Sequence, residues 1–251
     1  MAWPILAALV VSFAAIIGST ALLALGDRAE RAAVWILSFA IGTLLGGAAL
    51  HLLPEALEAR PTEQVMLLFI GGMLLFTILE RAIRWRHTHH AGEDHVHPHH
   101  AVTAEVLLWG DALHNFIDGI IVGVAFSVST ELGMIAAIAV FAHEVPQEIG
   151  DFAVLLAGGM GRKRALLLNY LSAFTVVPGA ALAWYSAASF EPAVGWLLPV
   201  AAGGFVYIAL ADLVPSLHHE KGAWAGVGQI ALMILGVAVI YFAGEALHHQ
   251  H

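Results

Sequence analysis

Cysteine is absent from the 251 residues of this chain, and charged residues make up only 12% of it. The lack of cysteine excludes disulfide bonds and thiolate metal sites. The shortage of charge, beside 60% hydrophobic residues and a mean hydropathy of +0.83, excludes an ordinary soluble domain. No GxxxxGK[ST] motif occurs, which argues against an intrinsic ATPase. These absences leave an integral membrane protein as the class that fits.

Long apolar runs follow one another along the whole chain. A helix needs ~20 predominantly apolar residues to cross the hydrocarbon core of a bilayer. Eight runs have about this length, at residues 3–25, 33–53, 64–84, 102–127, 132–158, 164–186, 193–214 and 224–246. Short polar stretches separate them, among them residues 26–31 and 55–63. We therefore expect an all-α integral membrane protein with eight transmembrane helices, forming one transmembrane domain over residues 1–251.

The distribution of lysine and arginine predicts the orientation of these spans. If the N-terminus lies outside, nine of the ten basic residues fall on the cytoplasmic side and only Arg60 falls on the other. Such an excess of basic residues is typical of the cytoplasmic loops of membrane proteins. An even number of spans returns the chain to the side on which it started, so we expect both termini outside.

The longest polar loop, at about residues 86–101 on the predicted cytoplasmic side, is rich in histidine. It contains two carboxylates and seven histidines, namely His87, His89, His90, His95, His97, His99 and His100. Such tracts bind borderline divalent ions weakly and flexibly. The sequence therefore predicts transient metal binding by this loop, and a solvated linker without function is the alternative.

A faint internal similarity links two distant segments. Residues 46–54 resemble residues 209–215, and alignment on Pro54 and Pro215 places His51 on Asp212. By the predicted orientation, the first segment ends its span outside and the second ends its span inside. Equivalent elements that run in opposite directions indicate an inverted repeat on either side of the fourth and fifth spans, which is a transporter design. Chance similarity between leucine-rich segments is the alternative.

Metal-ligand side chains occur inside the fourth and fifth spans. Residues 111–119 read DALHNFIDG, and residues 143–151 read HEVPQEIGD. Ionisable groups within a span cost ~2.5–3.5 kcal/mol each on insertion scales and are usually functional. His114 and Asp118 lie four residues apart, as do His143 and Gln147, so each pair shares one face of its helix. Pro146 removes one helical hydrogen bond and predicts a kink.

The two ligand-bearing faces are expected to meet. The loop that joins the two spans is short, so the spans are antiparallel neighbours, and His114 and His143 lie about equally far from the turn near Ser129. Both histidines therefore lie near the middle of the membrane. A lone buried histidine would be explained by hydrogen bonding, but several ligands at one depth predict a metal site between facing helices.

The ligand types narrow the choice of metal. Imidazole nitrogen with carboxylate oxygen suits Zn²⁺, Fe²⁺, Mn²⁺, Co²⁺ or Cd²⁺ better than Ca²⁺ or Mg²⁺. Glutamine is a poor, neutral ligand, and the moderate affinity that results fits an ion that must be released. Because binding needs neutral histidine and ionised aspartate, occupancy should fall in acid. We predict a first site at His114, Asp118, His143 and Gln147, and an adjacent one at Asn115 and Glu144 with Asp118 or Gln147 bridging.

These stretches resemble the ZIP (Zrt/Irt-like) family of divalent-metal transporters. The segment from His114 to Gly119 resembles the HNxxDG motif of the family's fourth helix, and the segment from His143 to Asp151 resembles the HExPHExGD signature of the fifth. Gln147 stands where that branch usually has histidine, a departure that bears on metal preference. The segments around residues 51 and 212 also resemble family segments, so the resemblance covers essentially the whole chain.

The resemblance implies uptake of Zn²⁺ or a related ion, as substrate, into the cytoplasm. It also implies a homodimer and a sliding, alternating-access motion. It places His51 and Glu55 near the outer entrance, and Asp212, Glu148 and Asp151 along the inner release route; helix-end polarity or ion pairing is the alternative for these residues. Asp111, one turn before His114, is a further pathway candidate. We expect a bacterial inner (plasma) membrane protein with no organic cofactor and no nucleic-acid partner.

An enzyme is the competing interpretation. The sequence His143-Glu144-x-x-Gln147 is one residue away from HExxH, the helical motif of zinc proteases, in which the glutamate acts as general base. Glutamine in place of the second histidine and Pro146 inside the motif argue against an intramembrane metalloprotease. A membrane metal sensor that moves no ion is the other alternative.

Overall fold

The computed structural model describes the chain except for residues 1–2, 90–98, 158, 188–190, 218–222 and 249–251. Every regular element in the described part is helical, as predicted. The elements are α1 (Trp3–Leu25), α2 (Asp27–Gly47), η1 (Ala48–Leu52), α3 (Leu53–Ala59), α4 (Thr62–His89), α5 (His99–Val128), α6 (Thr130–Ala157), α7 (Arg162–Ala173), α8 (Val176–Ala187), α9 (Glu191–Tyr207), η2 (Ile208–Leu213), α10 (Val214–Ser216) and α11 (Ala223–His248). The segments η1 and η2 are π-helical.

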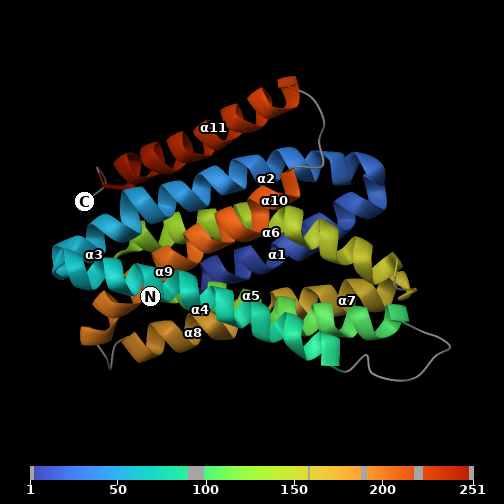
Figure 1. Ribbon diagram of the computed structural model, residues 1–251, viewed down its shortest axis with the longest axis horizontal. Coiled ribbons are helices and arrows are strands. Elements are labelled where there is room, and N and C mark those ends of the chain that lie inside the picture. Colours follow the sequence, from blue (N-terminus) through green and yellow to red (C-terminus); the bar gives the residue numbers. More distant parts are fainter. Residues whose placement is uncertain (1–2, 90–98, 158, 188–190, 218–222, 249–251) are drawn as a thin grey trace.

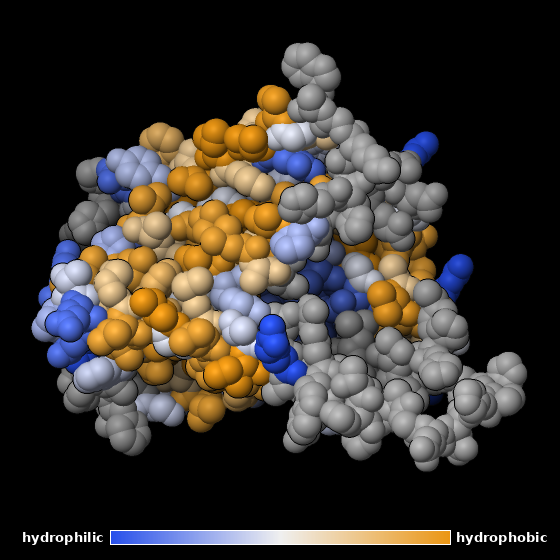
Figure 2. All heavy atoms as spheres, in the orientation of Figure 1, coloured by the Kyte–Doolittle hydropathy of each residue, from blue (hydrophilic) through white to orange (hydrophobic). Residues whose placement is uncertain are grey.

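The number of membrane-spanning helices fits the prediction. Seven helical stretches are long and apolar enough to cross a bilayer, and the shorter apolar helix Trp196–Ala211 takes the place of the remaining one. Their outer surface suits lipid rather than water, because large apolar side chains such as Leu67 and Phe242 are 64% and 66% exposed. Figure 2 shows hydrophobic residues covering most of the visible described surface.

Several helices extend beyond the predicted spans. Helix α2 begins at Asp27, directly after Gly26, whose φ of 52° lets the chain turn within one residue. Helix α3 continues to Ala59, so Glu55 lies in a helix rather than in the polar break predicted at residues 55–63. Apolar runs locate only the part of a helix that crosses the hydrocarbon, and these helices continue beyond it.

The predicted span 164–186 consists of two helices, α7 and α8. Pro178 has no N–H to bond the carbonyl of Phe174, and the N–H of Val177 bonds that carbonyl instead, at 3.0 Å. The helix is therefore interrupted at Phe174 and Thr175. The Thr175 hydroxyl donates to the carbonyl of Ala112 on α5, at 2.5 Å, so the break joins this span to the first ligand-bearing helix.

The helices pack as two groups. One group contains α1, α5, α6, α7 and α8, and the other contains α2, α4, α9 and α11 with the π-helical segments. The two groups meet mainly where α2 packs against α6 (Figure 1). Both ligand-bearing helices, α5 and α6, belong to the first group, so the predicted site lies within one group.

The internal similarity has a structural counterpart at both segments. The π-helix η1 directly precedes the short helix that contains Pro54, and the π-helix η2 directly precedes the one that contains Pro215. A π-helical turn is rare and commonly marks a functional position. His51 lies in the first π-helix and Asp212 in the second, as the alignment of the prolines predicts.

Two close contacts between helices are separated along the sequence by the same number of residues as the two prolines. Gly42 of α2 lies against the carbonyl oxygen of Met233 on α11, and Gly203 of α9 lies against that of Phe69 on α4. A Cβ atom at either glycine would collide with that oxygen. The two glycines are 161 residues apart, as are the two prolines above. The pair α2–α11 and the pair α9–α4 are therefore equivalent, which supports the predicted inverted repeat.

The helix ends agree with the predicted topology. The N-terminal end of α1 and the C-terminal end of α11 lie at the same end of the molecule (Figure 1). The start of α2 with Arg28 and the start of α7 with Arg162 lie at the opposite end, which is the end where basic residues were predicted. Arg60, the exception in the charge pattern, stacks on the ring of Trp196, with 3.8 Å between its guanidinium carbon and the ring centre.

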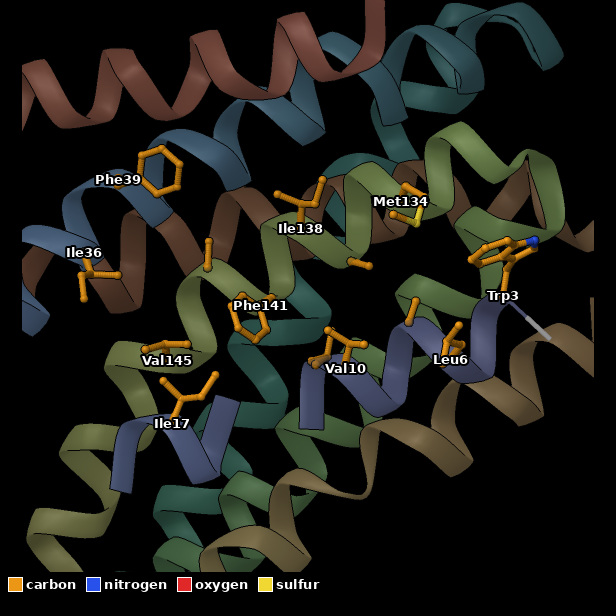
Figure 3. A pocket seen from close by; sticks show the side chains of 14 residues that line it. Trp3, Leu6, Val10, Ile17, Ile36, Phe39, Met134, Ile138, Phe141 and Val145 are labelled. Atoms are coloured by element: carbon orange, nitrogen blue, oxygen red, sulfur yellow. The ribbon is translucent and has the colours of Figure 1, made fainter. Parts of the chain in front are cut away.

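An apolar groove of about 580 Å³ runs along α1, α2 and α6 (Figure 3). Leu6 and Val10 line it from α1, Phe39 from α2, and Ile138 and Phe141 from α6. Its lining residues are all apolar, so it offers no ligands to a metal ion. The groove is a lipid-compatible surface beside the seam between the two helix groups.

The non-helical part of the histidine-rich segment is shorter than predicted. Helix α4 continues to His89 and helix α5 begins at His99, so the predicted loop at residues 86–101 is helical at both of its ends. His90, His95 and His97 lie outside the described residues. Metal binding by this segment stays a prediction.

Candidate metal site

A short turn brings the two ligand-bearing helices together. Helix α5 ends at Val128 and helix α6 begins at Thr130, with Ser129 between them. The Ser129 hydroxyl accepts a hydrogen bond from the N–H of Leu132, at 3.0 Å, and so caps the start of α6. The helices run antiparallel from this turn and pack against each other. His114 and His143 consequently face each other, with ring centres 5.7 Å apart and ring planes at 89°.

Four predicted ligands converge in the core between these helices. His114, Asp118, His143 and Glu144 each offer one ligand atom, and these atoms all lie within 4.8 Å of one another. The His143 Nε2 atom lies 3.0 Å from Asp118 Oδ2, and Glu144 Oε1 lies 3.5 Å from His114 Nε2 and 3.4 Å from His143 Nε2. These spacings leave room for one cation bound by all four residues.

Burial of the four side chains is almost complete. Asp118 and His143 are wholly buried and Glu144 is 1% exposed, whereas the side chain of His114 is 19% exposed. Burying two ionised carboxylates away from water costs folding free energy unless a positive charge lies beside them. His114 is thus the most exposed of the four side chains, although its Nε2 atom is buried.

A backbone contact selects the ring nitrogen that His143 directs into the site. Its Nδ1 atom lies 3.1 Å from the carbonyl oxygen of Ala139. A carbonyl only accepts hydrogen bonds, so Nδ1 carries the hydrogen and donates it. In the neutral ring, Nε2 then presents a lone pair toward Asp118. This arrangement is typical of metal-binding histidines, whose second nitrogen is held by a hydrogen bond.

The carboxylate oxygens are acceptors, as is His143 Nε2 in the neutral ring, and these facing atoms have no hydrogen-bond partner among the described residues. Within the described part of the chain, no hydrogen bond satisfies His114 Nε2, His143 Nε2, either carboxylate oxygen of Asp118, or Glu144 Oε1. Acceptors that face each other in a buried place repel unless a proton or a metal ion lies between them. The donor set of two imidazoles and two carboxylates suits a divalent transition metal ion.

The internal repeat continues through this site. Gly18 on α1 lies 3.0 Å, measured from an ideal Cβ, from the carbonyl oxygen of Val145 on α6, and Gly179 on α8 lies against that of Phe116 on α5. These glycines are again 161 residues apart. Their contacts make Phe116 the equivalent of Val145, 29 residues on. The same spacing pairs His114 with His143, so the candidate site lies where the two halves of the repeat meet.

Three carboxylates form a second group one turn away. Asp111, Glu144 and Glu148 also offer ligand atoms that lie within 4.8 Å of one another, and all three are buried. The predicted ligand Asn115 contacts this group, because its amide donates to Asp111 Oδ1 at 2.8 Å. Glu144 belongs to both groups.

The other predicted residues have separate positions. Gln147 lies on α6 with a buried, unpartnered Oε1 atom. His51 lies in η1, where its Nε2 atom is 3.3 Å from the carbonyl oxygen of Ile240 on α11. Glu55 and Asp151 belong to neither group of converging ligands, and the side chain of Asp212 is outside the described part of the structure. Their roles along a pathway stay predictions.

Two polar residues that the sequence analysis missed support the second group. The amide of Asn169 on α7 donates to Glu148 Oε2 at 2.5 Å and also lies 3.1 Å from the hydroxyl of Ser19 on α1. Neither residue belongs to a recognisable ligand pattern. The only signal in the sequence is a polar residue inside an otherwise apolar span.

The fold and the site together define a polytopic helical membrane protein with a buried group of metal ligands. The family model described as "ZIP Zinc transporter" matches residues 2–105 and 86–244 of the chain. The chain therefore belongs to the ZIP family.

Named relatives give the same assignment. The chain is 34% identical over 220 residues to zinc transporter ZIP13 of Pongo abelii, which covers 82% of the chain and 65% of the relative. It is 30% identical over 280 residues to zinc transporter ZIP4 of Homo sapiens, which covers 84% of the chain and 43% of the relative. A shorter match, 37% over 167 residues, relates it to zinc transporter ZIP10 of Homo sapiens, covering 61% of the chain and 20% of the relative. The chain thus spans less than two thirds of the length of these relatives.

Proposed function

We propose that this protein moves Zn²⁺ or a related divalent transition ion across a membrane, with the ion as substrate, through the group His114, Asp118, His143 and Glu144. The observation that carries the proposal is the set of facing, unpartnered acceptor atoms between α5 and α6. Buried acceptors of this kind need a cation. The relatives named above are zinc transporters, which supports the same function.

Charge balance favours a divalent ion. Two neutral imidazoles and two carboxylates carry a net charge of minus two, which one divalent cation neutralises. Nitrogen and oxygen ligands without thiolate suit Zn²⁺, Fe²⁺, Mn²⁺, Co²⁺ and Cd²⁺. We expect Zn²⁺ to be the main substrate, because two imidazoles bind it well.

The charge pattern supports the predicted orientation, and the direction that we propose for the ion is into the cytoplasm. Basic residues near the starts of α2 and α7 favour the cytoplasmic side for that end of the molecule. We also propose that the protein lies in a bacterial inner membrane and forms a homodimer. The contacts within a single chain test neither part of this proposal.

Uptake into proteoliposomes by the full-length protein tests the proposal. The vesicles would contain a zinc-sensitive dye, and the wild type would be compared with the double variant His114→Ala/His143→Ala. The matched control is Ser38→Ala, which removes a buried hydroxyl whose hydrogen bond goes to the Val34 carbonyl of α2, away from the site. We expect saturable uptake in the wild type and the control, and its loss in the double variant. Equal uptake in the double variant would reject the assignment of the site.

The same experiment separates the alternatives. The metalloprotease interpretation has no support among the relatives, which are named as transporters. Glu144 also lies beside both imidazoles, where it is better placed to bind a cation than to act as a base on a separate water. A protein that binds zinc tightly but never moves it would favour the sensor.

A further inference from the structure

We infer that the apolar groove along α1, α2 and α6 is a binding site for one acyl chain of a membrane lipid, and that this chain enters from the outer leaflet. A lipid can bind there whether or not an ion moves, so this site goes beyond the proposed transport. The groove also has none of the metal ligands, because its lining residues are all apolar.

The lining of the groove has the chemistry of a hydrocarbon site. It comes from three helices that are long and apolar enough to cross a membrane. Leu6 and Val10 of α1, which are 49% and 53% exposed, line one side, and the half-buried Ile138 and Phe141 line the α6 side (Figure 3). Apart from the indole of Trp3, no lining side chain carries a nitrogen or oxygen atom. A hydrocarbon chain is therefore the ligand that suits this surface.

The length of the groove matches the thickness of one leaflet. Trp3 and Met134 lie at one end of it, and Ile17 and Val145 lie at the other (Figure 3). Met134 and Val145 are eleven residues apart on α6, which at ~1.5 Å per residue is about 16 Å. The hydrocarbon core of a bilayer is ~30 Å thick, so one leaflet contributes ~15 Å of it. A single acyl chain of one leaflet would thus extend along the whole groove.

Trp3 favours the outer leaflet as the side of entry. It is 55% exposed and lies at the N-terminal end of α1, which is predicted to be outside. Tryptophan is enriched at membrane interfaces, where its ring lies at the level of the headgroups. A chain that enters beside Trp3 would end near the middle of the membrane, against Val145. No charged side chain lines the groove, so the site selects the acyl chain rather than a headgroup.

The groove is continuous with the lipid-facing surface and crosses the seam between the two helix groups. Helices α1 and α6 belong to one group and α2 belongs to the other; α1 and α2 each pack closely on α6 and touch each other little. A chain in the groove contacts all three helices, whereas a chain on an outward face such as that of α4 contacts a single helix. Because dispersion contacts add up, the chain in the groove should stay bound longer than the surrounding lipid.

Photolabelling of the full-length protein tests this site. The protein would be placed in phosphatidylcholine vesicles that contain a small fraction of phosphatidylcholine with a diazirine in the middle of one acyl chain. Peptide mapping would compare the groove with the α4 surface around Leu67, which is 64% exposed. We expect labelling of the groove to saturate as the fraction of diazirine lipid rises, and labelling of α4 to rise in proportion to it. Proportional labelling at both places would overturn the inference.

A tryptophan inside the groove should displace the acyl chain. Val10→Trp fills the groove from α1, and Val227→Trp on α11 is the matched control, because Val227 is 59% exposed and does not line the groove. We expect labelling of the groove to fall about tenfold in Val10→Trp and to stay unchanged in the control. Ile138→Trp fills the groove from α6 and repeats the test if Val10→Trp does not fold. Undiminished labelling in a folded groove variant would overturn the inference.

A second copy of the chain is the alternative occupant. Leu6→Cys places a single cysteine in the groove of a chain that otherwise has none. If a lipid fills the groove, oxidation should leave this variant monomeric. Disulfide-linked dimers of Leu6→Cys, together with an unlabelled groove in the wild type, would assign the groove to a contact between copies and overturn the lipid site. Zinc affinity should be the same in Val10→Trp and the wild type, so the lipid site and the metal site are tested separately.

Discussion

His143 Nε2 and Asp118 Oδ2 lie 3.0 Å apart, and neither side chain is exposed. The ring is oriented by its other nitrogen, which donates to the Ala139 carbonyl. A neutral imidazole and a carboxylate both present lone pairs across this gap. The pair is therefore arranged to share a cation, and that cation is either a proton or a metal ion.

Acid should weaken zinc binding for this reason. A proton on His114 or His143 occupies the lone pair that the metal needs, so the two compete and affinity falls as the pH falls. Between about pH 7.5 and pH 5.5, we expect the zinc affinity of the histidine-containing site to fall about 10- to 100-fold. Calorimetric titration at each pH measures this. The single variant His143→Ala should show a shallower dependence, and an affinity that is constant with pH would contradict the role of the histidines.

Gln147→His should tighten zinc binding. Gln147 lies on the same face of α6 as His143, and its buried Oε1 atom has no partner among the described residues. An imidazole there would be a stronger ligand than the amide. We expect the zinc dissociation constant to fall about tenfold and uptake to slow, because the ion leaves more slowly. If the affinity of this variant matches that of the wild type, Gln147 does not contact the ion.

Adjacent glycines of α4 provide a matched test of helix packing. An added Cβ at Gly72 would collide with the Val200 carbonyl of α9, whereas at Gly71 it would meet nothing within 4 Å. Gly72→Ala should therefore lower stability by about 1–3 kcal/mol, since neither backbone can give way cheaply. Gly71→Ala should be neutral or slightly stabilising, because alanine favours helix by about 1 kcal/mol. Thermal denaturation in detergent would compare the two, and equal melting temperatures would contradict the close contact.

The lack of cysteine makes topology directly measurable. Gly161→Cys lies just before α7, where an added side chain meets nothing within 4 Å, and Thr130→Cys lies at the exposed start of α6. On intact cells, a membrane-impermeant maleimide should label the cysteine at position 130 and reach position 161 only after the membrane is opened. The native chain is the unlabelled control. The reverse pattern would contradict the predicted orientation of the protein in the membrane.

Local features of the sequence predicted which side chains come together, but not every contact among them. The spacing of His114 and Asp118 places them on one face of their helix, and this does not depend on how the other helices pack. That the Asn115 amide donates to Asp111 depends on side-chain rotamers, which spacing does not specify. Asn169 was missed because it lies 21 residues from Glu148, on another helix.

The sequence by itself determined the class of protein, its spans and the chemistry at its centre. Hydropathy and ligand type are local properties, and a bilayer demands the same local pattern of every span. Only the tertiary structure decided which helices pair beyond α5 and α6, where Gly42 and Gly203 allow backbones to touch, and how Glu144 joins two groups of ligands. The physical reason is that helices apolar on all sides carry no periodic signal of which face packs inward. Their contacts depend on small residues and polar pairs that lie far apart along the chain.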